Sequence, residues 1–206
     1  RLVEARDPYT AGHQRRVAQL VRELAAGLGL SDEDTDDIWV AAQLHDIGKV
    51  SVPSDILSKP GRLTPAEYRL VQEHPETSFQ ILDSADLGGD IARVVHQHHE
   101  RLDGSGYPQG LTGDDILFGA RILAVADVVE AMVSHRPYRA GRGVGAALGE
   151  IGRNSGTLYD ETEVRTWWSP HAPCYVTSGA GGGSITILTP GPGRGRSGVK
   201  GVGRRA

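Results

Sequence analysis

The stretch GARILAVADVVEAM, residues 119–132, places one aspartate inside a long apolar run. The run predicts a strongly apolar helix over residues 120–133. An unpaired carboxylate at Asp127 would be costly in such a helix, so it requires a cation or a proton. Arg121 or Arg136 could neutralise it, and so could a metal ion. This stretch therefore predicts both a helical core and a charged group that needs a partner within it.

Helical spacing of apolar residues continues along most of the chain. Ser31 is a predicted N-cap, and Thr64 begins a capping box that includes Glu67. No segment shows sustained strand-like alternation with turn signals, so we predict an all-α bundle of about seven helices. The predicted helices cover 10–28, 31–45, a segment starting at 64, roughly 76–83 and 89–99, and then 120–133, 144–151 and 161–168.

The chain changes character after Trp168, so we predict a catalytic domain over residues 1–168 and a disordered tail over 169–206. Residues 179–206 contain ten glycines, five Lys or Arg and no acidic residue. SITILTP, residues 184–190, could form a strand, but we find no partner for it. An RNA-binding arm is the alternative for this basic tail, although it lacks aromatic residues to stack on bases.

Charge and composition exclude several classes of protein. The net charge is −4, and without the five basic residues of the tail it is −9, which is unfavourable for general nucleic-acid binding. We find no membrane segment and no signal peptide. The single cysteine, Cys174, excludes an internal disulfide. We therefore expect a cytoplasmic chain, and because it begins at Arg1 we expect a sensor or receiver domain upstream.

Five histidines and two aspartates lie at predicted helix ends or inside apolar helices. They are His13, His45, Asp46, His74, His98, His99 and Asp127. Each histidine taken alone is more often structural than a ligand, but one shared metal centre explains all seven residues. Imidazole and carboxylate donors suit Fe, Mn, Zn, Ni or Co, and the lack of cysteine ligands excludes a zinc finger. Seven ligands suit two ions that share a carboxylate, for which we choose Asp46.

Two motifs resemble a known family. HDIGK, residues 45–49, resembles the His-Asp signature of the HD phosphohydrolase superfamily, and HHERLDGSGYP, residues 98–108, resembles the second signature of its HD-GYP branch. The resemblance spans residues 2–168 and includes, in matching order, YTAGHQRRV (9–17), HPETSFQIL (74–82), GARILAVADVVEAM (119–132) and RPYR (136–139). It implies a helical bundle with a two- or three-metal centre. It also implies hydrolysis of cyclic di-GMP to pGpG and then GMP, with cyclic GMP-AMP preferred by some members.

By motif position, the resemblance assigns metal binding to the same seven residues. It also implies phosphate contacts at Lys49, Arg136 and Arg139, and it places the tyrosine of the GYP turn at Tyr107. We predict Asp46 and Lys49 as catalytic residues. Tyr107 is expected at the rim, where it contacts a guanine, contacts a partner domain or packs the loop.

The predicted cofactors are two divalent ions, Fe or Mn first, with Zn, Ni or Co as alternatives. Tyr9 stands where three-metal members carry a carboxylate, so we favour two ions. The predicted mechanism is in-line attack of a metal-activated hydroxide on phosphorus, with Lys49 and the RPYR arginines offsetting phosphate charge. We also expect Glu100 to orient a histidine and Asp103 to hold the glycine turn or orient a ligand.

Other functions stay open at this point. A nucleotidase or (p)ppGpp hydrolase would not need the HHE and GYP elements. A non-catalytic cyclic di-GMP receptor or signalling scaffold would usually lack a ligand, and all seven are present. The expected partners are a cyclic dinucleotide, a diguanylate cyclase and a second copy of the chain, and no nucleic-acid polymer.

Overall fold

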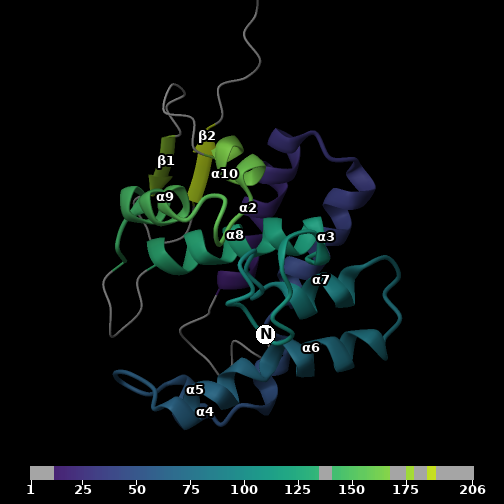
Figure 1. The fold of residues 1–206 in the computed structure, drawn as a ribbon, viewed down its shortest axis with the longest axis vertical. Helices are drawn as coiled ribbons and strands as arrows, with labels where there is room; N and C mark the ends of the chain where they lie inside the picture. Colours follow the sequence, from purple (N-terminus) through teal and green to yellow (C-terminus); the bar gives the residue numbers. More distant parts are fainter. Residues whose placement is uncertain (1–11, 135–140, 168–174, 179–184, 189–206) are drawn as a thin grey trace, which may run out of the picture.

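The helical bundle predicted from the sequence is confirmed in the computed structural model, which describes residues 12–134, 141–167, 175–178 and 185–188. Figure 1 shows the helices gathered around α8, with the strands β1 and β2 at one end. The longer helices are α2 (His13–Leu28), α3 (Asp32–Leu44), α5 (Pro65–Gln72), α6 (His74–Asp83), α7 (Ile91–Gln97), α8 (Phe118–Val133), α9 (Val144–Arg153) and α10 (Glu161–Trp167).

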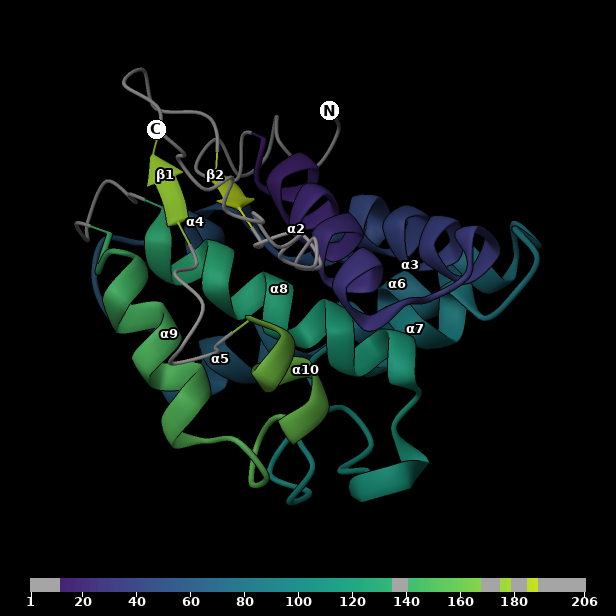
Figure 2. The same ribbon diagram turned by 90° about the horizontal axis from the view of Figure 1, so that it is seen from above.

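Helix α8 is the centre of the bundle, and α2, α3, α7, α9 and α10 all contact it (Figure 2). Its side chains Ile122, Leu123 and Val125 are fully buried in one hydrophobic core with Leu20 and Leu24 of α2. Full burial of a side chain of this size contributes about 1.5–3 kcal/mol. No helix of the described ranges, α8 included, is long and apolar enough to cross a bilayer.

Both predicted helix caps are confirmed. The Ser31 hydroxyl accepts a hydrogen bond from the Asp34 backbone N–H, and α3 then runs to its C-cap at His45. Thr64 and Glu67 form the two reciprocal bonds of a capping box at the start of α5. These caps satisfy backbone N–H groups that have no partner inside the helix. They therefore fix where α3 and α5 begin, and so where the residues that follow each helix lie.

Three short helical elements go beyond the sequence prediction. They are the 3-10 helix η2 (Ile47–Ser51), the single turn α4 (Ser54–Leu57) and a second 3-10 turn, η3 (Gly113–Asp115), which precedes α8. Neither α4 nor α5 contributes a buried side chain. In Figure 1 these two helices lie at the lower edge of the fold, beside α6. The α4–α5 segment is therefore a peripheral extension of the bundle.

The C-terminal region differs in part from the predicted irregular tail. β1 (Tyr175–Ser178) pairs antiparallel with β2 (Ile185–Leu188), with Tyr175 opposite Leu188. We predicted no partner for the SITILTP segment, but residues 175–178 supply one. Tyr, Val and Thr all have high strand propensity, so this segment offers a ladder of backbone hydrogen bonds. β2 also lies against α2.

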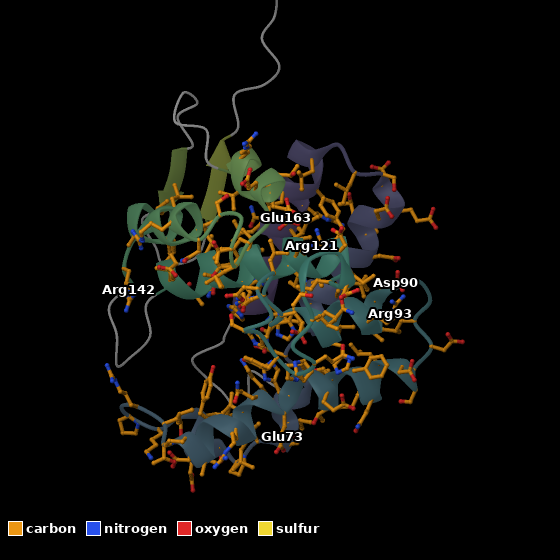
Figure 3. The ribbon with its side chains drawn as sticks, in the orientation of Figure 1. Glu73, Asp90, Arg93, Arg121, Arg142 and Glu163 are labelled. Carbon is orange, nitrogen blue, oxygen red and sulfur yellow. The ribbon has the colours of Figure 1, made fainter. Side chains whose placement is uncertain are left out.

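Glu163 of α10 is fully buried, and neither of its carboxylate oxygens has a hydrogen-bond partner among the described residues. In the view of Figure 3, Glu163 and Arg121 lie over the middle of the fold, whereas Asp90 and Arg93 lie toward its edge. Burial raises the pKa of Glu163 to about 9; Asp160 adds to the rise, and Arg121 partly opposes it. Glu163 is therefore protonated at neutral pH in the folded chain.

This pKa shift predicts a specific pH dependence of stability. The folded chain keeps a proton on Glu163 between the ordinary pKa of 4.5 and about 9, while the unfolded chain releases it. The free energy of unfolding therefore falls as pH rises through this window. Glu163→Gln should flatten the fall in melting temperature between pH 5 and pH 9. The control is Glu161→Gln, a change at an exposed neighbour on α10, which should leave the dependence of melting temperature on pH as it is in the parent. If Glu163→Gln and the parent showed the same dependence on pH, the raised pKa of Glu163 would be contradicted.

Candidate metal centre

The candidate histidines lie where helices begin or end. His13 is the first residue of α2, His45 is the C-cap of α3, and His98 is the C-cap of α7. His74 begins α6, directly after the end of α5. Asp127 lies within α8. The centre is thus assembled from the ends of four separate helices that meet on the side of α8.

The structure brings all seven predicted ligands together. Three groups have one ligand atom per residue within 4.8 Å of one another: His13 with His45 and Asp127, His74 with His98 and His99, and His45 with Asp46 and His98. Donor atoms at about 2.0–2.2 Å from one ion can be at most about 4.4 Å apart. Each group is therefore close to the spacing that a single ion requires.

Asp46 lies between the first two of these groups and belongs to the third. Its Oδ1 is 3.5 Å from Nε2 of His74, and its Oδ2 is 3.5 Å from Nε2 of His45 and 4.0 Å from Nε2 of His13. The two oxygens of one carboxylate therefore face opposite halves of the centre. This is the position that a carboxylate shared by two ions would occupy.

Backbone carbonyls orient three of the imidazoles in the same way. His45, His74 and His98 each have Nδ1 within hydrogen-bond distance of a carbonyl oxygen three residues earlier. The acceptors are Ala42 at 2.8 Å, Val71 at 2.7 Å and Val95 at 2.6 Å. Because a carbonyl only accepts, each Nδ1 must be the donor, which leaves Nε2 as the free lone pair of the neutral ring. All three Nε2 atoms lie in the centre.

The protonation states of three ligands favour metal binding. Burial lowers the pKa of His74 to about 4, although Asp46 opposes the shift. Burial and then neighbouring imidazoles hold the pKa of His98 and of His99 well below 6.5. These rings are therefore neutral at pH 7, and neutral imidazole is the form that binds a metal.

Both carboxylates of the centre are ionised. Burial alone would raise the pKa of Asp46, but Lys49 and then His45 outweigh burial and hold it well below 3.8. The Lys49 ammonium donates to Oδ2 of Asp46 at 2.8 Å. Burial is likewise outweighed at Asp127, where the hydrogen bond and charge of His13 hold the pKa low. The predicted phosphate contact, Lys49, therefore lies directly beside the carboxylate at the middle of the centre.

Gly48 of the HDIGK motif lies in close contact with the start of α6. Its backbone N–H donates to the Ser78 hydroxyl at 2.8 Å, and that hydroxyl donates to the His45 carbonyl at 3.0 Å. A Cβ at Gly48 would lie 2.1 Å from the His74 carbonyl oxygen and 2.6 Å from the Ser78 backbone N. Only glycine therefore allows η2 to approach α6 this closely, and the contact sets the positions of His45 and His74.

Glu130 is a residue beside the centre that the sequence analysis missed. It is buried in α8, and its carboxylate contacts Nδ1 of His13 on the side opposite Asp127. His13 Nε2 is 3.2 Å from Asp127 Oδ1. Burial lowers the pKa of His13, but the two carboxylates outweigh burial and raise it to about 9. The available signal was a second carboxylate one turn after Asp127 in the same apolar helix.

Glu100 and Asp103 both accept hydrogen bonds from backbone N–H groups. The Glu100 carboxylate accepts from the backbone N–H groups of Gln109 and Leu111 at 2.7 and 3.0 Å, so the expectation that it orients a histidine is wrong. Asp103 accepts from the Ser105 N–H, as expected of a residue that holds the turn. Both side chains therefore shape the loop that carries the GYP motif.

Tyr107 packs on a candidate ligand. Its ring centroid is 4.7 Å from that of His99, and its backbone N–H donates to the His99 carbonyl at 3.2 Å. Gly106 makes this approach feasible, since a Cβ there would lie 2.4 Å from the Glu100 Cα. Of the three roles left open for Tyr107, the packing role is the one with a contact among the described residues.

The remaining predicted residues lie elsewhere. Arg136 and Arg139 fall outside the described residues. Arg121 is not the partner of Asp127; it forms ion pairs with Asp160 and Asp114 at 3.1 and 3.3 Å. The neutralisation of Asp127 within the described part of the chain comes from histidines of the centre.

The HD domain family matches residues 1–162, which include all seven candidate ligands. This chain belongs to the HD domain family. It is 44% identical over 162 residues to 3'3'-cGAMP-specific phosphodiesterase 3 of Vibrio cholerae, covering 78% of this chain and 35% of that protein. It is 41% identical over 165 residues to the cyclic di-GMP phosphodiesterase response regulator RpfG of Xanthomonas campestris, covering 78% and 43%. This HD domain chain spans less than half the length of these relatives.

Solved structures support the same fold. Bd1817, an HDG"Y"P protein from Bdellovibrio bacteriovorus, superposes with a TM-score of 0.63 and 22% identity over 75% of this chain and 49% of that chain. A cyclic GMP-AMP specific phosphodiesterase of V. cholerae superposes with a TM-score of 0.50 and 37% identity over 80% and 37%. The HD-GYP resemblance predicted from HDIGK and HHERLDGSGYP is confirmed.

The close approach at Gly48 predicts the effect of adding one methyl group. Gly48→Ala should lower stability by about 1–3 kcal/mol, as overpacking of a tight contact does, and should reduce the metal bound per chain because His45 and His74 move. The measurements are the melting temperature and the metal content after dialysis. Gly145→Ala is the matched control, since a Cβ there meets nothing within 4 Å. Equal melting temperatures for Gly48→Ala and parent would contradict this packing argument.

Proposed function

We propose that this chain is a metal-dependent phosphodiesterase that hydrolyses cyclic di-GMP to pGpG, GMP or both. The observation that carries the proposal is the position of Asp46, one oxygen of which faces His45 and the other His74, members of two different groups of metal-type ligands. Two metals held in this way are a common means of cleaving phosphodiesters. The names of the relatives, among them a cyclic di-GMP phosphodiesterase of Thermotoga maritima that is 42% identical over 171 residues, support this substrate class.

The donor set fits two divalent transition-metal ions. Five imidazoles and two carboxylates, with no thiolate, suit Fe or Mn first, and Zn, Ni or Co as alternatives. We propose His13, His45 and Asp127 for one ion, His74, His98 and His99 for the other, and Asp46 for both. Such ions, when bound, supply Lewis acidity: they bind phosphate oxygens and lower the pKa of water.

The residues of the chain supply the remaining electrostatics. Lys49 is only 17% exposed and lies 2.8 Å from Asp46, so its ammonium can offset charge on a phosphate at the centre. We propose the same task for Arg136 and Arg139, whose guanidinium groups suit a two-pronged grip on phosphate. The aromatic face of Tyr107 beside His99 would then border the substrate.

Cyclic GMP-AMP is a second candidate substrate. It is favoured by the 44% identity to 3'3'-cGAMP-specific phosphodiesterase 3 and by the solved V. cholerae structure of that specificity. Both substrates carry the same two phosphodiester bonds, so the metal centre would act on either. We further propose that residues 1–168 are the catalytic unit of a longer cytoplasmic protein, in which a sensor or receiver domain regulates them and a diguanylate cyclase or a second copy is a partner.

Asp46→Ala should lower hydrolysis of cyclic di-GMP at least ~10²-fold, because it removes the carboxylate that faces both halves of the centre. The assay is product chromatography on protein purified without oxygen and loaded with Fe²⁺ or Mn²⁺, with cyclic GMP-AMP in parallel. Asp90→Ala, an exposed carboxylate at the edge of the fold, should keep the parent rate. Full activity of Asp46→Ala would overturn the proposal, and binding without turnover in the parent would support a receptor instead.

A further inference from the structure

The imidazole ring of His13 is oriented differently from those of His45, His74 and His98. His45, His74 and His98 follow the C-terminal ends of helices, where backbone carbonyls lack intrahelical partners and can accept Nδ1–H. His13 is the first residue of α2, directly after its N-cap Gly12. The start of a helix presents unpaired N–H groups and no unpaired carbonyl. The backbone there cannot fix the His13 ring, so a side chain must.

Glu130 fills this need from the neighbouring helix. Its carboxylate is 1% exposed, and Oε2 contacts Nδ1 of His13. The other oxygen, Oε1, accepts from Nε of Arg16 at 2.6 Å and from the Ser134 hydroxyl. Arg16 supplies the charge that lets an ionised carboxylate stay buried. Both oxygens of Glu130 are thus committed, which leaves its side chain little freedom to turn away from His13.

Asp127 and Glu130 lie one turn apart on α8 and face the two nitrogens of the same ring. Asp127 is itself a candidate ligand, so its contact with Nε2 marks the metal side. Glu130 is on the opposite side and cannot reach the same ion while it holds Nδ1. The geometry therefore divides the tasks: one carboxylate belongs to the centre, and the other fixes the imidazole.

We propose that Glu130 is a positioning residue, which holds His13 through Nδ1 so that Nε2 serves as the ligand of the Asp127 half of the centre. This inference rests on the proposed metal centre. A carboxylate acceptor makes the bound imidazole more basic than a neutral carbonyl does. The ion in the His13 half therefore depends on Glu130, whereas the ion in the His74 half does not.

Glu130→Gln tests this division. Glutamine keeps the volume, but its amide must turn its NH₂ toward either His13 or Arg16, and both are donors. In titrations of the metal-free chain with Mn²⁺, followed by calorimetry, one ion should bind about 10–100-fold more weakly than in the parent. The second ion should keep its affinity. Equal affinities for both ions in parent and variant would overturn the proposal, as would an equal loss at both ions with a lowered melting temperature.

A matched variant and a metal-independent measurement complete the design. Glu163→Gln makes the same change at a buried carboxyl in α10 that contacts none of the candidate ligands, and it should leave both Mn²⁺ affinities unchanged. Ring NMR of the metal-free chain should show His13 resonances shifted in Glu130→Gln, with those of His45, His74 and His98 unmoved. Unmoved His13 resonances would overturn the role of Glu130. A parent chain that takes up no metal would instead overturn the proposed function, while the ring spectra still decide on Glu130.

Discussion

Hydrogen bonds from imidazole Nδ1–H groups to carbonyls at the C-terminal ends of α3, α5 and α7 are the constraint on which both the fold and the centre depend. A buried carbonyl without a partner is costly, and each of these ends has an imidazole three residues later that donates to it. The same hydrogen bond closes the helix and turns Nε2 of the ring inward. Helix termination and ligand orientation are therefore one interaction, so any change in helix length would displace a ligand.

The charge of the centre is balanced by groups that belong to the fold. Asp46 and Asp127 are ionised in a mainly apolar interior, where an isolated charge would be unstable. Lys49 and His13 compensate them, while His74 and its neighbours are kept neutral by burial. His74, His98, His99 and the two aspartates thus hold the protonation states that a divalent ion requires, whereas His13 keeps a proton. That exception is confined to the half of the centre that Glu130 controls.

The sequence predicted most of the fold and the centre, because the signals were local. Caps at Ser31 and Thr64, the apolar pattern of α8 and the HDIGK motif each depend on residues a few positions apart. Glu130 was missed because its partner, His13, is 117 positions away and no local pattern joins them. The role expected for Glu100 was wrong because both of its carboxylate oxygens accept backbone N–H groups, those of Gln109 and Leu111, which are nine and eleven positions away.

The quoted motif HHERLDGSGYP proves to be one physical unit. The sequence suggested two separate tasks, ligands at its start and a glycine turn at its end. In the structure, the buried Glu100 carboxylate accepts hydrogen bonds from two backbone N–H groups of the loop that follows the turn. Gly106, which has no Cβ, allows that loop to lie against the backbone of Glu100. The turn then brings Tyr107 onto the ring of His99 and into a hydrogen bond with its carbonyl. The turn therefore supports one candidate ligand, His99, as Glu130 supports another, His13. A loop thus holds a histidine in one half of the centre, and a single carboxylate holds a histidine in the other half.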